Sequence, residues 1–545
     1  MAVRSFWAGL GVIVVETRTH GDRKMSLTRR MFVQRIAQLG GYSAAFSTMQ
    51  VLGLLPAVGQ SMLPKLAGDF GKGKKVVILG GGIAGLVVAY ELRKTGFSCT
   101  ILEARNRPGG RSWSVRNGSK VEFTDGTVQH CEWSDGGYLN AGPARIPSHH
   151  THLLDYCQEL GVPLEVEVNT SRSALMQAPM LNGGKPVEQR QVLYDTRGYI
   201  AELLAKAIDQ HALDRALTKE EVTQMLDFLK GFGDLDETGK YVGSLRAGFT
   251  TPRGAGPSKV VLHQPLKLEE LLAADFSKGE FYEDQIDWQL TMFQPVGGMD
   301  RIPYGFAKVL DELIQYECPV SEITTGEKSV TVAYAKGGVA QTMTADFCIC
   351  TMPISVLAKT KNNFSAETQA AFSGMPMTAL YKVAWESPRF WEKENRIYGG
   401  ISFLKNTVDL VWYPTDKLFS KTGVIVAGFN SERDDLTGKP TPFGALPTVA
   451  AKLEASKAAV ELLHPGRSKE LTKPIYVSWS KIPYSLGCFA NNHLASSDGA
   501  YAQLEKPQGR TYFAGDYLSH LVGWQEGAAL SAHHAIERIA GVVKG

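Results

Sequence analysis

Lys75 to Glu103 read KVVILGGGIAGLVVAYELRKTGFSCTILE, and this stretch decides the fold. Residues 76–79 form a short apolar run rich in β-branched side chains, which is typical of a strand buried in a parallel sheet. A helix-patterned stretch follows at 86–92, and a second apolar run at 99–102 predicts another strand. Because strand, helix and strand follow one another, we expect a βαβ unit and an α/β fold with a Rossmann-type domain.

Three glycines join the first strand to the helix with G-x-G-x-x-G spacing, at Gly80, Gly82 and Gly85. Gly80 is expected to make the tight turn, Gly82 to let a pyrophosphate approach the backbone, and Gly85 to let helix and strand pack closely. The N–H groups and dipole at the start of the helix favour the negative phosphates. Glu103 closes the unit, where a carboxylate accepts a hydrogen bond from a ribose 2′-OH. The pattern predicts a dinucleotide and leaves NAD and FAD as alternatives.

Length and composition are those of a soluble protein with several domains. A chain of 545 residues is too long for one hydrophobic core and predicts two or three domains. The formal net charge of +3, with no concentrated basic stretch in the folded region, argues against a nucleic-acid binder. The seven cysteines form no CxxC pair and no cluster with histidine, so we expect no metal site and interpret most of them as small buried side chains.

The N-terminus carries an export signature. Residues 28–33 read TRRMFV, a twin-arginine pattern, and a moderately apolar stretch follows to about Leu63. We therefore predict a twin-arginine leader at residues 1–63 and a periplasmic or secreted protein, which would be cytoplasmic if the leader is not used. The alternative is a basic arm or an amphipathic helix packed on the domain. Glycine, serine and glutamine interrupt the apolar stretch too often for a stable membrane span.

Three separated regions are expected to share the nucleotide-binding domain, namely residues 72–120, 296–365 and 495–545. Residues 121–190 and 366–494 are assigned to a substrate-binding domain with a mixed sheet, and residues 191–295 to a helical insert. Periodicity predicts helices at 303–316 and 527–542 and strands at 329–334, 341–344, 347–351, 378–385, 408–413 and 511–514.

Two patterns predict helices in the insert. Apolar residues spaced by 3, 4, 7 and 8 positions predict one buried helix face, at Ile200, Leu203, Leu204, Ala207 and Ile208. Residues 218–221 have the pattern of a capping box and predict the start of another helix. We interpret both helices as structural.

Six motifs in a fixed order resemble the flavin amine oxidase superfamily and, within it, the L-amino-acid oxidases. The resemblance covers nearly everything after Lys74. Besides the βαβ unit, its motifs are RPGGR at 107–111, GPARIP at 142–147, GMD at 298–300, YK at 381–382 ahead of FWE at 390–392, and FAGD at 513–516 followed by GW at 523–524. The resemblance implies FAD as the cofactor and a mixed-sheet substrate domain beside the Rossmann-type domain.

The resemblance and the βαβ unit together imply a set of FAD contacts. They are Gly80, Gly82, Ile83, Ala84, Gly85, Glu103, Ala104, Arg105, Gly110, Arg111, Gly142, Pro143, Ala144, Arg145, Val320, Trp479, Gly515, Asp516, Gly523 and Trp524. Residues 484–489 also resemble the segment through which mitochondrial monoamine oxidases attach flavin to a cysteine, so a covalent link through Cys488 is an alternative. L-amino-acid oxidases normally bind FAD without a covalent bond, and we expect the same here.

Arg145 and Lys382 are the predicted catalytic residues. In L-amino-acid oxidases the arginine of G-P-x-R binds the substrate carboxylate, which the guanidinium fork grips at two points, so the resemblance gives this role to Arg145. Lys382 lies in an apolar strand, and the superfamily keeps a lysine there that holds a water against the flavin. The alternatives are an ion-paired or surface arginine and an outward-facing lysine.

The remaining substrate contacts follow from the same resemblance. Trp524 resembles the aromatic wall of the substrate pocket, and the carbonyl of Gly523 resembles the acceptor for the substrate amine. Trp412, Tyr413 and Trp479 are candidate pocket aromatics, with packing in a core sheet as the alternative. The tyrosine that supplies a second carboxylate contact in many L-amino-acid oxidases aligns with Gly428, so this contact is missing or comes from another residue such as Tyr413.

The expected function is oxidative deamination of L-amino acids, with large apolar or aromatic side chains favoured by the aromatic pocket. The products would be a 2-oxo acid, ammonia and hydrogen peroxide, with oxygen as the second substrate, and we expect a homodimer or higher homo-oligomer. The alternatives are an amine or polyamine oxidase, an amino-acid monooxygenase, and a protein that binds FAD without turnover.

Overall fold

The computed structural model describes residues 65–544 except 135, 211, 214, 216, 252, 258, 436 and 491–498, and leaves out the side chains of 278 and 280. The predicted leader therefore lies outside the described residues. No helix in the described part of the chain is long and apolar enough to cross a membrane.

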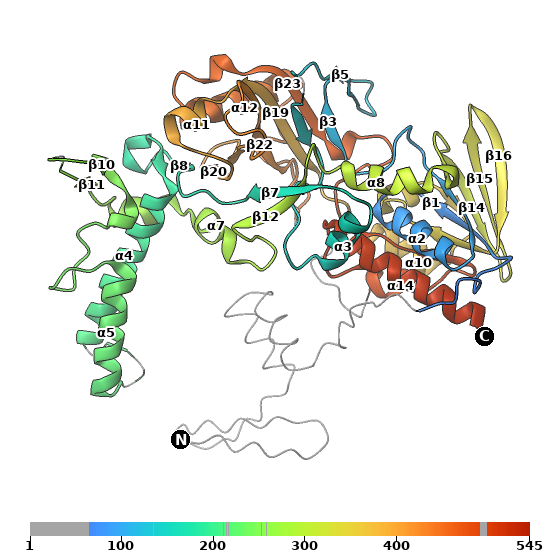
Figure 1. Cartoon of the computed structure of the whole chain (residues 1–545), viewed down its shortest axis with the longest axis horizontal. Helices are drawn as coiled ribbons and strands as arrows, with labels where there is room; N and C mark the ends of the chain where they lie inside the picture. The colour runs from blue at the N-terminus through green and yellow to red at the C-terminus, as the bar shows by residue number, and fades with distance from the viewer. Residues whose placement is uncertain are drawn as a thin grey trace. The chain divides into compact units, whose positions relative to one another are not determined.

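A five-stranded parallel sheet contains the predicted βαβ unit (Figure 1). Its strands, in spatial order, are β13 (Ile314–Gln315), β2 (Ser98–Leu102), β1 (Lys75–Leu79), β17 (Phe347–Cys350) and β24 (Thr511–Phe513). All four pairings are parallel. Since both faces are covered, the central strands are apolar throughout rather than alternating. Three segments far apart in the sequence thus supply strands to one sheet.

Helices cover one face of this sheet and a β-meander covers the other (Figure 1). The helices are α2 (Ile83–Lys94), α8 (Arg301–Leu310) and α14 (Gln525–Lys544), of which α8 and α14 both contact α2. The meander consists of β14 (Val320–Thr325), β15 (Val330–Lys336) and β16 (Val339–Ala345), with β18 (Lys361–Asn362) parallel to β14. Val77 and Cys348 of the sheet share one apolar core with Ile323 and Val332 of the meander. The strands predicted at 329–334 and 341–344 are confirmed, and they pair with each other.

A seven-stranded mixed sheet forms the second core. Its strands, in spatial order, are β23 (Thr472–Ser478), β19 (Leu380–Pro388), β22 (Thr422–Ser431), β21 (Leu410–Trp412), β20 (Ile401–Leu404), β8 (Leu175–Gln177) and β9 (Val187–Glu188). Only β20 and β8 pair in parallel among these strands. Helices α11 (Phe390–Asn395) and α12 (Val449–Leu463) pack with it around buried aromatic residues. The predicted mixed sheet is thus present, and its central strand β19 carries Lys382.

Short elements join the two sheets. They are β3 (Ser114–Arg116) paired with β6 (Tyr138–Asn140), β4 (Lys120–Glu122) paired with β5 (Val128–His130), β7 (Leu164–Val168) paired with β12 (Thr291–Pro295), and the helices α3 (Thr151–Glu159), α9 (Ile354–Leu357), α10 (Ala366–Ser373) and α13 (Ala500–Glu505).

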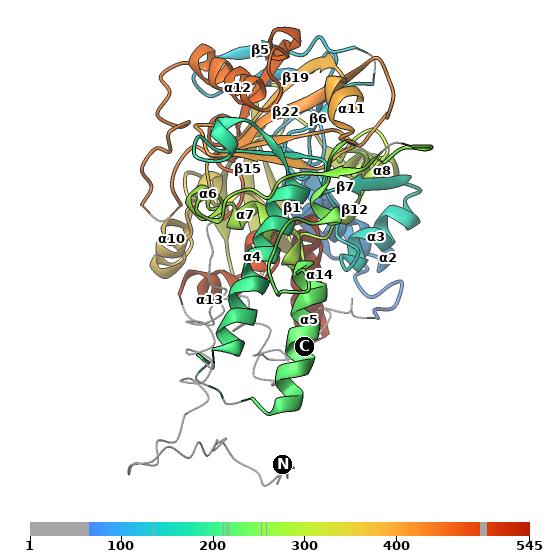
Figure 2. The same ribbon diagram turned by 90° about the vertical axis from the view of Figure 1, so that its left-hand side faces the viewer.

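Figures 1 and 2 show α4 (Gln189–Asp209) and α5 (Lys219–Gly233) side by side in the helical segment. Shorter elements follow, namely β10 (Phe249–Thr251), β11 (Val261–Leu262), α6 (Leu268–Ala274) and α7 (Ser277–Glu280). The capping box predicted at 218–221 is confirmed, because Thr218 and Glu221 each bond the other's backbone N–H.

The apolar face predicted for α4 is wrong in part. Ile200 and Leu203 are 51% and 54% exposed, whereas Ala201 is fully buried. The reason is close helix packing, since a Cβ built on Gly233 of α5 would lie 2.3 Å from the Cβ of Ala201. Small residues therefore face the neighbouring helix, and the larger apolar side chains lie outside the contact.

The helix predicted at 303–316 also differs from the structure. Helix α8 ends at Leu310, one tight turn follows, and residues 314–315 pair with Ile101 and Leu102 as strand β13. A two-residue strand is too short to show hydrophobic periodicity in the sequence. Its conformation is determined by pairing with the edge of β2.

Candidate active site

A cavity opens at the carboxyl ends of the parallel strands. Gly80, Thr351 and Gly515, which follow β1, β17 and β24, all line it, as does Ile83 at the start of α2. Including the space that is open to solvent, its empty volume is about 1130 Å³. Crevices at this edge of a doubly wound sheet are the usual ligand sites of such folds.

The glycines of the βαβ unit act as the spacing predicts. Gly80 has a φ of 107° and lies against Thr351, so a side chain there would be strained. A Cβ on Gly85 would lie 2.1 Å from the carbonyl oxygen of Gly80, which shows how closely helix and strand approach. A Cβ on Gly82 would meet no atom within 4 Å, and Gly82 caps α2 without a side-chain hydrogen bond. The start of the helix is therefore open to a phosphate group.

Two backbone groups hold the carboxylate of Glu103 at the cavity wall. Glu103 is 3% exposed and accepts hydrogen bonds from the N–H groups of Gly81 at 2.7 Å and Arg105 at 2.8 Å. These bonds fix its orientation, and a carboxylate held in this way suits the hydroxyl groups of an adenosine ribose. The buried guanidinium of Arg105 donates to the carbonyl of Pro483 and the hydroxyl of Ser485.

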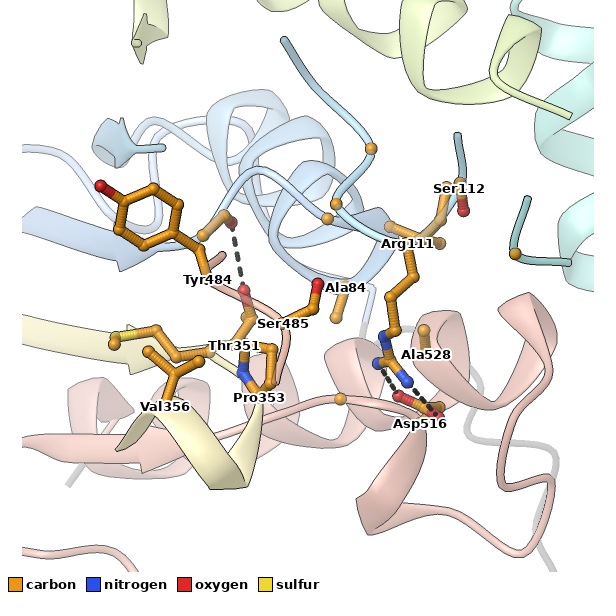
Figure 3. Close-up of a pocket in the computed structure, with 18 of the residues that line it drawn as sticks. Ala84, Arg111, Ser112, Thr351, Pro353, Val356, Tyr484, Ser485, Asp516 and Ala528 are labelled. Carbon is orange, nitrogen blue, oxygen red and sulfur yellow. Dashed lines mark hydrogen bonds and ion pairs between the residues drawn. The ribbon is translucent and has the colours of Figure 1, made fainter. Parts of the chain in front are cut away.

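Arg111 and Asp516 form an ion pair across the cavity wall. Figure 3 shows the guanidinium of Arg111 facing the carboxylate of Asp516, which lies on the C-terminal segment. Burial opposes the charge of Arg111, but the Asp516 carboxylate raises its pKa above the ordinary value. Asp516 also accepts from the N–H of Gly523 at 3.0 Å. The pair thus joins two of the family motifs around one wall of the cavity.

Lys382 is buried behind this cavity. Its side chain is 4% exposed, and Nζ donates to the carbonyl oxygens of Asn140 at 2.6 Å and Gly142 at 2.8 Å. Burial, and to a smaller extent the positive charge of Arg145, lower the pKa of Lys382 to about 7. The alternative of an outward-facing lysine is therefore wrong. An amine with this pKa both accepts and donates a proton near neutral pH.

The guanidinium of Arg145 lies between two indole rings. Its central carbon is 4.3 Å from the ring centroids of both Trp288 and Trp412, and the side chain is buried. Nη1 donates to the amide oxygen of Asn169 and, at 3.0 Å, to the hydroxyl of Tyr282. Within the described part of the chain, no hydrogen bond from Nη2 or Nε is found. Arg145 is therefore fixed on one edge and on both faces, and its other donors remain for a ligand.

Glu167 lies beside this arginine without forming an ion pair with it within 4 Å among the described residues. One carboxylate oxygen accepts from the indole N–H of Trp412 at 3.2 Å, and the other has no partner in the described structure. Burial raises the pKa of Glu167 to about 7, although Arg145 and the Trp412 hydrogen bond both lower it. Its charge therefore changes near neutral pH, next to the predicted carboxylate site.

Aromatic rings connect Arg145 to the cofactor cavity. The ring centroids of Trp288 and Trp524 are 5.5 Å apart, and Trp524 lines the cavity. On the other side, Nζ of Lys382 lies 5.6 Å from the ring centroid of Trp412. The two predicted catalytic side chains thus both lie near the indole of Trp412, close to the cavity.

The structure places most predicted FAD contacts on the cavity wall, with four exceptions. Gly85 lies in the turn behind it, and Trp479 packs behind Gly142 and donates to the carbonyl of Ala141 at 2.8 Å. Ala144 lies beside Lys382 and Trp412 in a second, smaller pocket. Arg145 lies beyond the cavity with its two indoles. Cys488, the residue considered for a covalent link, does line the cavity.

Tyr413 does not serve as the second carboxylate contact. Its hydroxyl is within hydrogen-bond distance of Ser402 Oγ at 2.9 Å and His464 Nε2 at 2.7 Å, and its ring is fully buried in the core of the mixed sheet. Because residues alternate along a strand, Trp412 faces the site and Tyr413 faces away from it. Tyr282, which bonds Arg145, is the hydroxyl that the structure offers near the arginine.

Sequence reasoning missed four residues around Arg145, namely Glu167, Asn169, Tyr282 and Trp288. Glu167 lies in β7 and Asn169 directly follows it, whereas Tyr282 and Trp288 lie in the segment that leads into β12, the strand that pairs with β7 across a long sequence gap. Glu167 alternates with Val166 and Val168 in a strand pattern, and this was the one available signal. The loop that carries Trp288 shows no hydrophobic periodicity, so the position of Trp288 in the fold could not be predicted from the sequence.

Comparisons with known proteins point to one family. The family model described as flavin containing amine oxidoreductase matches residues 83–540. Curated relatives include a putative L-amino-acid oxidase of Bacillus subtilis (strain 168), 26% identical over 84% of this chain and 92% of that protein. Another is a flavin-dependent L-tryptophan oxidase of Lentzea aerocolonigenes, 25% identical over 86% of this chain and 98% of that protein.

Solved structures show the same fold at lower identity. Putrescine oxidase bound to putrescine is 18% identical with a TM-score of 0.56, and the match covers 86% of this chain and 99% of that one. Cyclohexylamine oxidase from Brevibacterium oxydans IH-35A is 16% identical with a TM-score of 0.58, covering 87% and 100%. From the extent of the family match and this shared fold, we conclude that the chain belongs to the flavin-containing amine oxidoreductases.

Proposed function

We propose that this protein is an FAD-dependent oxidase of L-amino acids, which it converts to 2-oxo acids with release of ammonia and hydrogen peroxide. The observation that carries the proposal is the position of Arg145, a buried cation with unused donors close to the cofactor cavity. A simple amine has no carboxylate for such a group to bind, whereas every amino acid has one. The L-amino-acid oxidases among the relatives support the same substrate class.

Bound FAD would supply the redox step, accepting the hydride of the substrate Cα and passing electrons to oxygen. The residues of the cavity fit this cofactor, because the open start of α2 suits a pyrophosphate and Glu103 suits a ribose. The contribution of the protein is positioning in a site that excludes water.

Each side chain then has a defined task. Arg145 would hold the carboxylate by its free donors, with Trp288 and Trp412 keeping the guanidinium plane fixed. The backbone carbonyl of Gly523 would accept from the substrate amine, as the family resemblance implies. Lys382, with its pKa near 7, would hold or transfer a proton at Nζ while two carbonyls fix its position. The resulting imino acid hydrolyses to the 2-oxo acid.

The surrounding rings favour large apolar or aromatic substrates. Trp288, Trp412, Trp524 and Tyr282 all lie within two contacts of the guanidinium. Stacking and burial against such rings stabilise an aromatic substrate side chain more than a small or charged one.

We propose that FAD binds without a covalent link. Burial raises the pKa of the Cys488 thiol to about 12, although Arg111 and Lys382 act in the opposite direction. Since the thiolate is the reactive form, a thiol with this pKa attacks poorly at neutral pH. Acid precipitation should release a yellow supernatant and leave colourless protein, and a protein pellet that stays yellow would contradict the proposal.

Export and assembly also remain proposals. The twin-arginine pattern at residues 28–33 supports export to the periplasm or the medium. We expect a homodimer or higher homo-oligomer, which sedimentation would test. Replacing Arg29 and Arg30 by lysine should retain the protein in the cytoplasm, as fractionation would show.

A peroxide-coupled screen of L-amino acids, D-amino acids and amines tests the activity. We expect peroxide with large apolar or aromatic L-amino acids, a 2-oxo acid as the product, and little turnover of the D-enantiomers. Turnover of amines in preference to amino acids would favour an amine oxidase, and an amide product would favour a monooxygenase. The absence of peroxide with every compound would favour a non-catalytic FAD-binding protein.

A further inference from the structure

Three potential metal ligands meet next to the aromatic rings of the site. His149 and His150 come directly before α3, and Asp287 comes from the loop ahead of β12. One ligand atom from each lies within 4.8 Å of the others. His149 Nε2 is 2.7 Å from the carboxylate of Asp287, and His150 Nε2 is 3.7 Å from the same oxygen. The sequence does not reveal this cluster, because Asp287 lies more than a hundred residues from the two adjacent histidines.

A hydrogen bond between His149 and Asp287 explains two of these side chains but not the third. His150 is 1% exposed, and neither of its ring nitrogens has a hydrogen-bond partner in the described structure. Buried polar groups are nearly always paired, so an imidazole left with both nitrogens free points to a missing partner. The distance of 3.7 Å to Asp287 is too long for a hydrogen bond and leaves room for an ion between the two groups.

We propose that His149, His150 and Asp287 form a binding site for a divalent transition-metal ion, with Zn²⁺ as the best match. Two imidazoles and one carboxylate are a ligand set that zinc prefers, with a water in the fourth position. Bonds of about 2.0–2.2 Å place tetrahedral ligand atoms roughly 3.4 Å apart, which small side-chain rotations reach from the observed spacing. His149 and Asp287 are 33% and 25% exposed at their side chains, so an ion can enter from solvent.

The position of the site gives the ion a structural consequence. The ring of His150 packs edge-on against Trp524 at 5.0 Å, and Asp287 directly precedes Trp288, which stacks on Arg145. The two loops already contact each other, since Gln289 accepts from the N–H of Ser148 at 2.9 Å and His149 is hydrogen-bonded to Asp287. A bound ion would add a further connection, through His150, and fix the loop that carries Trp288.

Zinc titration of the FAD-loaded enzyme tests the site. The protein is purified without a histidine tag, stripped with a chelator that is then removed, and titrated with Zn²⁺ by calorimetry, with bound metal measured by mass spectrometry. We expect one tight equivalent per chain and a rise of the thermal midpoint with zinc, because an ion that binds only the native state stabilises it.

Variants distinguish this site from adventitious binding. His149→Ala and Asp287→Asn change partly exposed side chains, and each should weaken zinc binding at least tenfold and abolish the thermal shift. His130→Ala is the matched control, since this exposed histidine lies on β5, and it should bind zinc as the wild type does. Absence of a tight equivalent in the wild type, or unchanged affinity in both site variants, would overturn the proposal.

Discussion

Replacing Arg145 by alanine should separate amino acids from amines as substrates. The guanidinium has three N–H donors left once the two bonds of Nη1 to Asn169 and Tyr282 are made, and a carboxylate held at two points uses two of them. A hydrogen bond to a charged group contributes about 1.5–3 kcal/mol, so two contribute at most about 3–6 kcal/mol. Water partly replaces the lost contacts, and we therefore expect a loss of about 3–4 kcal/mol, which is a roughly 10²- to 10³-fold decrease in kcat/KM.

The assay compares L-phenylalanine with phenethylamine, its decarboxylated analogue, by peroxide release in wild type and variant. The amine has no carboxylate, so its kcat/KM should change little. Arg145→Met is the matched control, because it keeps an apolar stem between Trp288 and Trp412 and removes the charge and the donors. Arg145→Met should lose as much activity on the amino acid as Arg145→Ala. The flavin absorption spectrum verifies that both variants still bind FAD.

Two results would refute this reasoning. One is a decrease of less than about fivefold for the amino acid, which is under 1 kcal/mol and too small for a lost carboxylate clamp. The other is an equal decrease for both compounds, which would mean that the substitution damages the site as a whole.

Three further predictions follow from single contacts. Glu167, with a pKa of about 7, is neutral below this pH and anionic above it. Because the anion competes with the substrate carboxylate for Arg145, the KM of the wild type should rise between pH 6 and 8. Glu167→Gln should give a KM that does not change with pH, and a slope equal to that of the wild type would exclude this role. Gly85→Ala places a methyl group 2.1 Å from a backbone oxygen and should lower the ratio of bound flavin to protein, with Gly541→Ala, where a Cβ meets nothing within 4 Å, as the control. Asp516→Asn leaves the guanidinium of Arg111 in the cavity wall without its counter-charge. This should lower the free energy of unfolding, measured by urea titration, by about 3 kcal/mol. A change below about 0.5 kcal/mol would contradict the importance of this ion pair.

Local pattern predicted the nucleotide-binding part of the fold well. The strand, glycines and helix of residues 75–103 depend on contacts within one short segment, and the ends of each element lie within three residues of their predicted places. Gly80 and Gly85 have positions that only a residue without a side chain tolerates. Here the local conformational preferences of the chain and the tertiary fold agree.

Prediction failed where distant segments decide the outcome. Residues 314–315 become a strand because β2 has a free edge, and the large apolar residues of α4 lie outside because Gly233 lets α5 come close. The partners of Arg145 lie next to β7 and β12, two strands that pair only in the folded chain. The arginine itself could be predicted from its motif, whereas the indoles that hold it could not.

In the proposed function, the four residues Gly142 to Arg145 would connect the cofactor to the substrate. Gly142 and Pro143 line the large cavity, Ala144 lines the neighbouring pocket, and Arg145 carries the guanidinium. An insertion within these residues would misalign the reactants even if each site stayed intact by itself. Evolution of new substrate preferences is therefore expected to change the surrounding aromatic loops and to leave the length of this tetrapeptide unchanged.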